Sequence, residues 1–153
     1  MTERPRTGEL VLHVTFRASP ERIFSQMTDP AELVTWWGPN GFSTPEAVID
    51  LSVGGEYRLT MQPPDGAPFH LAGAFLEVDR PNRLSYTFRW EEPVPEDRET
   101  VVVLDFHPVH GGTEVVLSQR GFATDERLQL HRDGWTQAFG KLRTLLEGTA
   151  PTD

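Results

Sequence analysis

The chain has 153 residues, no cysteine and a formal net charge of −9. Without cysteine it can form no disulfide, thiolate metal site or thiol nucleophile, and its negative charge disfavours binding to nucleic acids or to anionic membrane surfaces. No apolar run reaches the ~20 residues of a transmembrane helix, and the polar residues 1–9 contain no apolar segment typical of a secretory signal. We therefore expect a soluble, cytoplasmic protein that binds neither nucleic acid nor membranes.

The N-terminal part of the chain predicts one strand followed by two short helices. Residues 10–16 read LVLHVTF, a run typical of a strand. The SPE segment at 19–21 then combines a capping serine, a proline suited to the first helical position and an acid at the positive helix end. Asp29 and Glu32 have the spacing of a second helix start. The GPNG segment at 38–41 ends that helix.

Residues 44–120 predict six strands joined by hairpin turns. Residues 83–90 alternate most clearly, with an apolar side chain at every even position. We assign those positions to the core, because the opposite choice would bury Arg83 and Arg89 without partners. Gly54-Gly55 is predicted to form a bulge or a tight turn before a strand. Strands so close in sequence favour antiparallel pairing. The predicted strands span 46–51, 56–62, 69–78, 83–90, 100–107 and 113–120.

The C-terminal segment carries the strongest periodicity of the chain. With Thr124 as N-cap, its apolar side chains fall on one helical stripe, and Gly148 is a natural stop. About 23 residues at 1.5 Å each give a helix of about 35 Å, which can cross a small sheet. Leu130, Gln137 and Lys141 lie off the stripe and are predicted to be exposed. The stripe consists of Leu128, His131, Trp135, Ala138, Phe139, Leu142, Leu145 and Leu146.

Together these elements predict an α+β protein of the helix-grip type. A curved antiparallel sheet of about seven strands, two short helices after the first strand and a long C-terminal helix packed across the sheet would bury one sheet face and one helix stripe together. Residues 9–148 would form this one domain, with flexible ends at 1–8 and 149–153.

Sequence motifs for catalysis or metal binding are absent. The chain has no phosphate-binding glycine loop and no GxSxG nucleophile segment. His107 and His110 come nearest to a metal pair, but they lead into a Gly111-Gly112 turn, and catalytic zinc usually needs three protein ligands. We therefore predict no catalytic residues, no metal site and no cofactor. The acidic, proline-containing segment 91–99 is predicted to be a solvated loop.

Two polar residues are candidates for the interior. His131 lies at the edge of the apolar stripe, one turn before Trp135, where it could be a hydrogen-bonded interior residue, a polar contact to a ligand or a catalyst. Glu77 alternates with Phe75, and an inward carboxylate there would need a partner. If Glu77 and His131 met, they could act as an acid and base pair.

Several short motifs along the chain point to one family. They are SPERIF at 19–24, WWGP at 36–39, Asp50 followed by GGEYR at 54–58, GAFLEV at 73–78 with PNRL at 81–84, TEV at 113–115, and Gly134-Trp135. In order and spacing they resemble the homologues of the heat-shock-protein-90 ATPase activator, within the START-related SRPBCC superfamily of birch-pollen-allergen fold. The resemblance covers about residues 10–147 and departs at Ser52, where a basic residue is expected. It implies a cavity between sheet and long helix, often suited to apolar ligands.

This superfamily includes carriers, receptors, cyclases and co-chaperone domains, so the fold leaves several functions open. The leading hypothesis is a non-enzymatic carrier or sensor that binds a small apolar or aromatic molecule in the cavity. One alternative is a cyclase- or dehydratase-like enzyme that uses His131 and Tyr86. The other is a co-chaperone-like domain acting through its surface, with a chaperone partner implied by resemblance alone; a homodimer is also left open. The predicted cavity residues are Trp37, Tyr57, Leu59, Met61, Phe75, Tyr86, Phe88, Trp90, His131, Trp135 and Phe139. Trp36 and Trp37 could gate the cavity mouth, or one could pack in the core while the other covers the surface.

Overall fold

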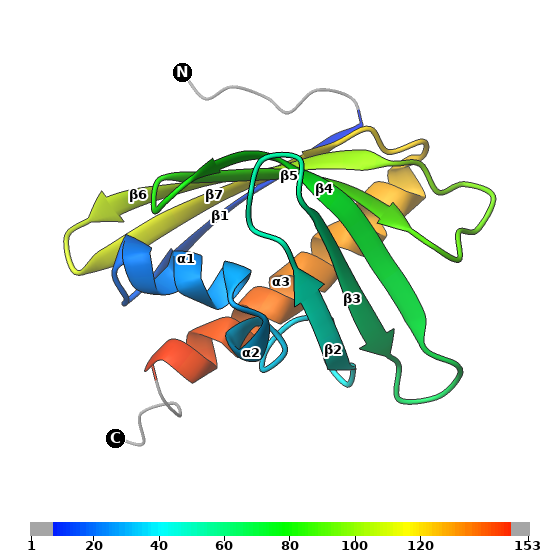
Figure 1. Ribbon diagram of the computed structural model, residues 1–153, viewed down its shortest axis with the longest axis horizontal. Coiled ribbons are helices and arrows are strands. Elements are labelled where there is room, and N and C mark those ends of the chain that lie inside the picture. The colour runs from blue at the N-terminus through cyan, green and yellow to red at the C-terminus, as the bar shows by residue number, and fades with distance from the viewer. Residues whose placement is uncertain (1–7, 148–153) are drawn as a thin grey trace.

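A computed structural model describes residues 8–147, which form a seven-stranded antiparallel sheet and three helices. The strand order is β1-β7-β6-β5-β4-β3-β2. Figure 1 shows the sheet curving around α3, with α1 and α2 on the same side of the sheet. This arrangement confirms the predicted α+β helix-grip fold. The strands are β1 (Glu9–Phe16), β2 (Ser43–Ile49), β3 (Glu56–Gln62), β4 (Phe69–Asp79), β5 (Arg83–Trp90), β6 (Thr100–Val109) and β7 (Gly112–Arg120). The helices are α1 (Pro20–Thr28), α2 (Pro30–Leu33) and α3 (Asp125–Glu147).

The predicted ends of the chain, 1–8 and 149–153, lie outside the described residues except for Gly8, whose carbonyl accepts hydrogen bonds from Gly121 N and Phe122 N. Gly148, the predicted helix stop, also lies outside them. Within residues 8–147, no helix is both long and apolar enough to cross a membrane.

The predicted helix starts are confirmed by their capping hydrogen bonds. Ser19, Asp29 and Thr124 each accept a bond from a backbone N–H two or three residues later, at 2.9–3.1 Å. Such bonds satisfy amide groups that have no partner within the helix. The starts of all three helices are therefore encoded locally.

The double glycine makes the predicted tight turn into β3. Gly54 has a φ of +85°, a conformation that residues with a Cβ rarely adopt. A Cβ on Gly55 would lie 2.3 Å from the carbonyl oxygen of Asp50. Both positions therefore require glycine for the backbone to close this turn.

The core lies between the concave face of the sheet and α3. The predicted inner face of β5 is confirmed: Leu84, Tyr86 and Phe88 are buried there. Trp36 is also buried, and its indole N–H donates to Gln26 O at 3.1 Å. Trp37 is buried as well, so the interpretation in which one of the two tryptophans covers the surface is wrong. Helix α3 contributes Leu128, Trp135, Ala138, Phe139 and Leu142 to this core.

For three residues of α3 the structure differs from the predicted burial. Gln137 and Lys141 are half-buried, because both contact the loop after α2: Gln137 Oε1 accepts from Asn40 N at 2.9 Å, and Lys141 Nζ donates to Pro39 O at 3.3 Å. Leu145, predicted on the buried stripe, is 44% exposed, whereas its neighbour Leu146 packs against the core.

Glu77 points to solvent, which corrects its expected inward orientation. The pairing of β4 with β5 shifts between Phe75, opposite Tyr86, and Glu77, opposite Ser85. Such a bulge reverses the face on which later side chains lie. Glu77 Oε1 instead accepts from Arg83 Nε at 2.8 Å on the exposed face.

We expect Phe139→Ala to reduce the free energy of unfolding by about 3–5 kcal/mol, because a large buried ring is lost from the core. Phe139 is 2% exposed and its ring lies 5.8 Å from Phe16 and 5.5 Å from Trp135. Urea unfolding followed by circular dichroism measures the change. The matched control on the same helix is Leu145→Ala, for which we expect at most about 0.5 kcal/mol. Similar losses in the two variants would contradict the observed packing face of α3.

Candidate functional site

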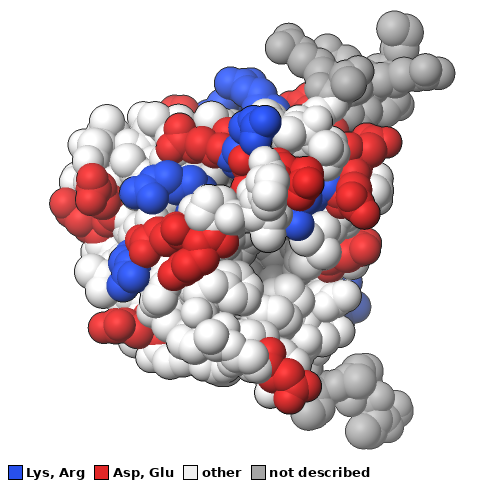
Figure 2. Space-filling view, turned by 90° about the vertical axis from the view of Figure 1, so that its right-hand side faces the viewer, with Lys and Arg blue, Asp and Glu red and all other residues white. Residues whose placement is uncertain are grey.

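A cavity of about 510 Å³ opens between α3, the ends of β3 to β5 and the loop after α2. This volume lies within the range of small-molecule sites. Figure 2 shows a hollow with mainly uncharged walls on this side of the molecule, below a group of charged side chains. Its lining comprises Trp37, Gly38, Pro39, Phe42, Met61, Phe69, Phe88, Trp90, Glu92, Val94, Asp97, Arg127, Leu130, His131, Asp133, Gly134, Trp135, Gln137 and Ala138.

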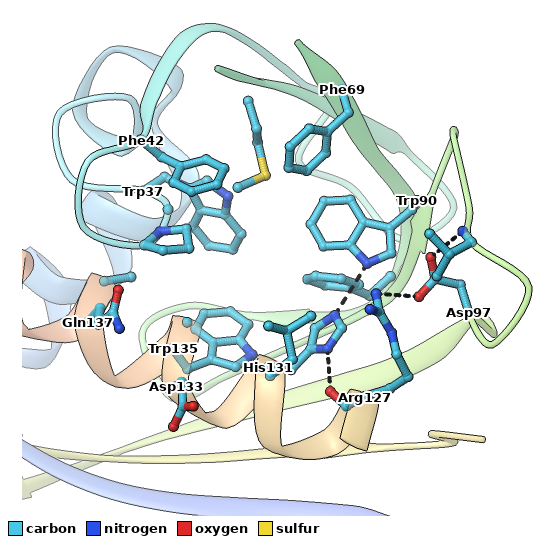
Figure 3. A pocket seen from close by; sticks show the side chains of 18 of the residues that line it. Trp37, Phe42, Phe69, Trp90, Asp97, Arg127, His131, Asp133, Trp135 and Gln137 are labelled. Atoms are coloured by element: carbon cyan, nitrogen blue, oxygen red, sulfur yellow. Dashed lines mark hydrogen bonds and ion pairs between the residues drawn. The ribbon is translucent and has the colours of Figure 1, made fainter. Parts of the chain in front are cut away.

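Aromatic rings form a large part of the cavity wall (Figure 3). Phe88 and Trp90 have the same parity on β5, and their ring centroids lie 5.2 Å apart in an edge-to-face contact. Trp37, from the loop after α2, contacts Trp135 of α3 at 5.1 Å. Phe69, at the start of β4, contacts Trp90 at 5.3 Å. Edge-to-face contacts of this kind hold rings at fixed angles, so the wall is already formed without a ligand.

Two of the α3 residues that line the cavity are small. Gly134 and Ala138 line the cavity on consecutive turns of the helix. A Cβ on Gly134 would have Pro39 Cγ, at 3.7 Å, as its nearest neighbour across the space. Larger side chains at these two positions would occupy the volume between the helix and the Pro39 loop.

A buried polar network fixes the orientation of Trp135. Its indole N–H donates to Gln119 Oε1 at 2.7 Å, and Gln119 Nε2 donates to Thr100 Oγ1 at 2.8 Å. Thr100 Oγ1 in turn donates to Phe88 O at 3.4 Å. The network therefore connects α3 with β5, β6 and β7 and leaves no polar group of this set unsatisfied.

His131 is held in one tautomer at the cavity wall. The indole N–H of Trp90, which can only donate, lies 3.3 Å from His131 Nε2. Nε2 must therefore accept, and the ring proton resides on Nδ1, which donates to Arg127 O at 2.8 Å. Burial lowers the pKa of His131 and outweighs the opposite effect of its hydrogen bond to the Arg127 carbonyl. Both ring nitrogens are thus used in holding the neutral side chain in place.

The acidic loop, residues 91–99, lines the mouth of the cavity. The sequence had predicted only a solvated loop there. Asp97 Oδ1 lies 2.6 Å from Arg127 Nη2, and Asp97 Oδ2 accepts from Val94 N at 2.9 Å. The Asp97 side chain is only 8% exposed. This ion pair attaches the loop between β5 and β6 to the first turn of α3 (Figure 3).

Six of the eleven predicted cavity residues line the cavity, and five do not. The lining ones are Trp37, Met61, Phe88, Trp90, His131 and Trp135. The other five, packed in the core away from the cavity, are Tyr57, Leu59, Phe75, Tyr86 and Phe139. The alternation along each strand correctly indicated which of these side chains face the interior. It did not indicate which of them lie next to the cavity. Sequence reasoning missed Phe42, Phe69 and the two small helix residues, although the alternation of β4 could have indicated Phe69.

The proposed acid and base partners are not brought together. Glu77 lies on the outer face, paired with Arg83, and is not among the residues around His131. Tyr86 is buried among Tyr57 and Phe75, and burial raises the pKa of its hydroxyl further above the ordinary value of 10.0. The cavity therefore does not hold the acid and base pair that the sequence suggested.

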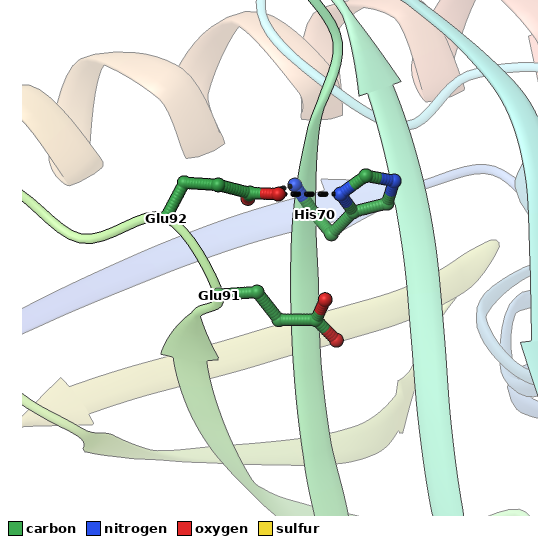
Figure 4. Close-up of side chains that lie close together, drawn as sticks. All are labelled: His70, Glu91 and Glu92. Atoms are coloured by element: carbon green, nitrogen blue, oxygen red, sulfur yellow. Dashed lines mark hydrogen bonds and ion pairs between the residues drawn. The ribbon is translucent and has the colours of Figure 1, made fainter.

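A second group of polar side chains lies at the ends of β4 and β5 (Figure 4). Ligand atoms of His70, Glu91 and Glu92 all lie within 4.8 Å of one another, a spacing that could hold a cation. However, both oxygens of Glu91 accept bonds from Arg58 at 2.9 Å, and Glu92 accepts from His70 N at 2.8 Å. The bonds from Arg58 lower the pKa of Glu91, and the pKa of Glu92 is lowered mainly by a side-chain bond between His70 Nδ1 and Glu92 Oε2 at 2.7 Å, with a smaller effect of the backbone bond. The group is therefore an ion-pair cluster that joins β3 and β4 to the acidic loop.

We expect His131 to make folding pH-dependent below neutrality. Its pKa is lowered from 6.5 in the folded state, so the unfolded chain takes up this proton at a higher pH than the folded chain. Stability from His131 should be complete above about pH 7, fall as the pH decreases through about 6.5, and stop falling below the folded pKa. Urea midpoints measured across this range, compared with His131→Gln, isolate the effect. A constant difference between the two proteins across that range would contradict the neutral, buried state of His131.

Comparisons with known proteins agree with this architecture. A protein of Chromobacterium violaceum of known structure has a TM-score of 0.83 and 25% identity, over 93% of this chain and 99% of that chain. The AHSA1 protein from Silicibacter pomeroyi has a TM-score of 0.80 and 28% identity, over 91% of this chain and 97% of that chain. A Rhodobacter sphaeroides protein has a TM-score of 0.82 and 27% identity, over 95% and 96%. The comparison with curated proteins gives no significant match. The model of the Activator of Hsp90 ATPase homolog 1-like protein family matches residues 17–147, and the chain therefore belongs to this family.

Proposed function

We propose that the protein binds a small, mainly apolar or aromatic molecule in the cavity between the sheet and α3, as a carrier or sensor. The observation that carries this proposal is the open volume of about 510 Å³ within an aromatic wall. An engineered apolar void of about 150 Å³ is already enough to bind benzene. Burial of ligand surface against preformed rings supplies the main driving force.

The two alternatives receive less support from the geometry. A cyclase or dehydratase would need convergent titratable groups with shifted pKa values, whereas the nitrogens of His131 are used internally and Tyr86 is in the core. A surface co-chaperone would be favoured by a continuous apolar patch. Among residues 8–147 the large exposed apolar side chains are distributed over several elements: Val48, Val53, Leu76, Val94, Val109, Leu130 and Leu145.

Ligand binding can be tested with N-phenyl-1-naphthylamine, a neutral dye whose fluorescence rises in apolar surroundings. We expect saturable binding to the wild-type protein. Gly134→Leu should weaken it by roughly 5- to 100-fold in Kd, because the new side chain occupies cavity volume and overpacking costs about 1–3 kcal/mol. Fluorescence titration of each purified variant measures the dissociation constant.

The matched control is Gly140→Leu, at a glycine of the same helix that is exposed and has no atom within 4 Å of an added Cβ. Both substitutions replace a helical glycine and should favour the helix by about 0.5–1 kcal/mol. Only Gly134→Leu should affect dye binding. An equal effect of the two variants, or no saturable binding to wild type, would refute the proposal.

A further inference from the structure

The four tryptophans of the chain differ in how their indole N–H groups are satisfied. Trp36 donates to Gln26 O at 3.1 Å, Trp90 to His131 Nε2 at 3.3 Å, and Trp135 to Gln119 Oε1 at 2.7 Å. Trp37 Nε1 is buried and has no hydrogen-bond partner among the described residues. Trp37 is also a lining residue of the cavity. The one unsatisfied indole donor is therefore in the wall of the candidate site.

The ring of Trp37 cannot easily turn to find a partner. It is in edge-to-face contact with Trp36 at 5.6 Å and with Trp135 at 5.1 Å. Its carbonyl oxygen is held by Thr44 Oγ1 at 3.2 Å. A buried donor without an acceptor destabilises the folded protein, and more than about 90% of buried polar groups in proteins have partners. Nε1 exposes almost no surface, so an acceptor that enters the cavity would have to displace a neighbouring side chain to reach it, and the bond formed would then satisfy this donor.

The other unsatisfied polar atom of the lining is also a donor. Arg127 Nε is buried without a partner, although the guanidinium contacts Asp97 through Nη2. Figure 3 shows Trp37 and Arg127 on opposite sides of the cavity. The third such atom among the described residues, Gln26 Oε1, belongs to a residue outside the cavity lining. Two buried donors in the cavity wall, Trp37 Nε1 and Arg127 Nε, therefore have no acceptor among the described residues.

Charge restricts the ligand further. The lining contains three carboxylates, those of Glu92, Asp97 and Asp133, and one guanidinium, that of Arg127, which is paired with Asp97. The whole chain also carries a net charge of −9. An anion entering this mouth meets a repulsive field, which salt would screen.

We infer that the cavity selects a neutral, mainly apolar ligand that carries a hydrogen-bond acceptor, such as a carbonyl oxygen, and that Trp37 Nε1 donates to it. This inference rests on the proposed function, because it specifies the chemistry of the same site. Trp37 then acts as the polar contact that orients the ligand, a role that the sequence had suggested for His131.

A set of three naphthalene probes separates these requirements. 2-Acetylnaphthalene has a carbonyl acceptor, 2-ethylnaphthalene has a similar shape without one, and 2-naphthoate has acceptors and a negative charge. We expect wild type to bind the acetyl probe about 3- to 10-fold more tightly than the ethyl probe, as one added hydrogen bond provides. The naphthoate should bind more weakly than the acetyl probe, with a gap that narrows as salt increases. Equilibrium dialysis with absorbance detection measures all three constants.

Trp37→Phe tests the donor, because it removes the N–H and keeps an aromatic ring. In this variant the preference for the acetyl over the ethyl probe should disappear, whatever the loss in affinity for the ethyl probe. The matched control is Trp90→Phe, which also removes an indole from the wall, but one whose N–H already donates to His131. It should weaken both probes by similar factors and leave their ratio unchanged.

The outcomes distinguish the two proposals. If neither neutral probe binds to wild type, the proposed function is refuted and the inference falls with it. If wild type binds both neutral probes equally, water satisfies Trp37 and the inference alone is refuted. A preference that persists in Trp37→Phe would also refute it, by placing the donor elsewhere, and tighter binding of naphthoate would refute the selection of a neutral ligand.

Discussion

The packing of α3 against the concave face of the sheet is the contact on which both the core and the cavity depend. In the C-terminal half of the helix, Phe139 and Leu142 fill the space beneath the sheet, and Phe139 contacts Phe16 of β1. Ala138 and Gly134 lie one and two turns before Leu142 and line the cavity with almost no side chain. Small residues at these two positions leave volume beside Trp135 that larger side chains would fill.

Several polar side chains in and behind the cavity wall are held by hydrogen bonds within the protein. Gln119 accepts a hydrogen bond from Trp135 and donates one to Thr100, and His131 accepts one from Trp90. A wall that is already ordered reduces the entropy that a ligand must lose to bind. Satisfied groups contribute no new hydrogen bonds to a ligand, so under the proposed function a ligand would be oriented by the few donors left over. Trp37 and Arg127 hold those donors.

The fold could be predicted because its signals are local. The caps at Ser19 and Thr124 and the alternation of β5 each depend on residues close in sequence. The cavity was predicted only in part, because strand parity gives the face of a side chain but not its position along a curved sheet. Glu77 was misplaced for a related reason: a bulge arises from pairing with another strand. Asp97 lies at the cavity because its ion pair with Arg127 joins the loop to α3. No local sequence pattern indicates such a contact.

The state of His131 connects stability with the choice between binding and catalysis. A general base needs a free nitrogen lone pair within reach of the substrate proton. In this protein the Nε2 lone pair accepts from Trp90, and Nδ1 donates to the backbone of α3. Using His131 as a base would break the contact that joins β5 to the helix, and protonation would place two donors against each other. The arrangement therefore favours a neutral structural histidine whose two ring nitrogens both hold the wall in place.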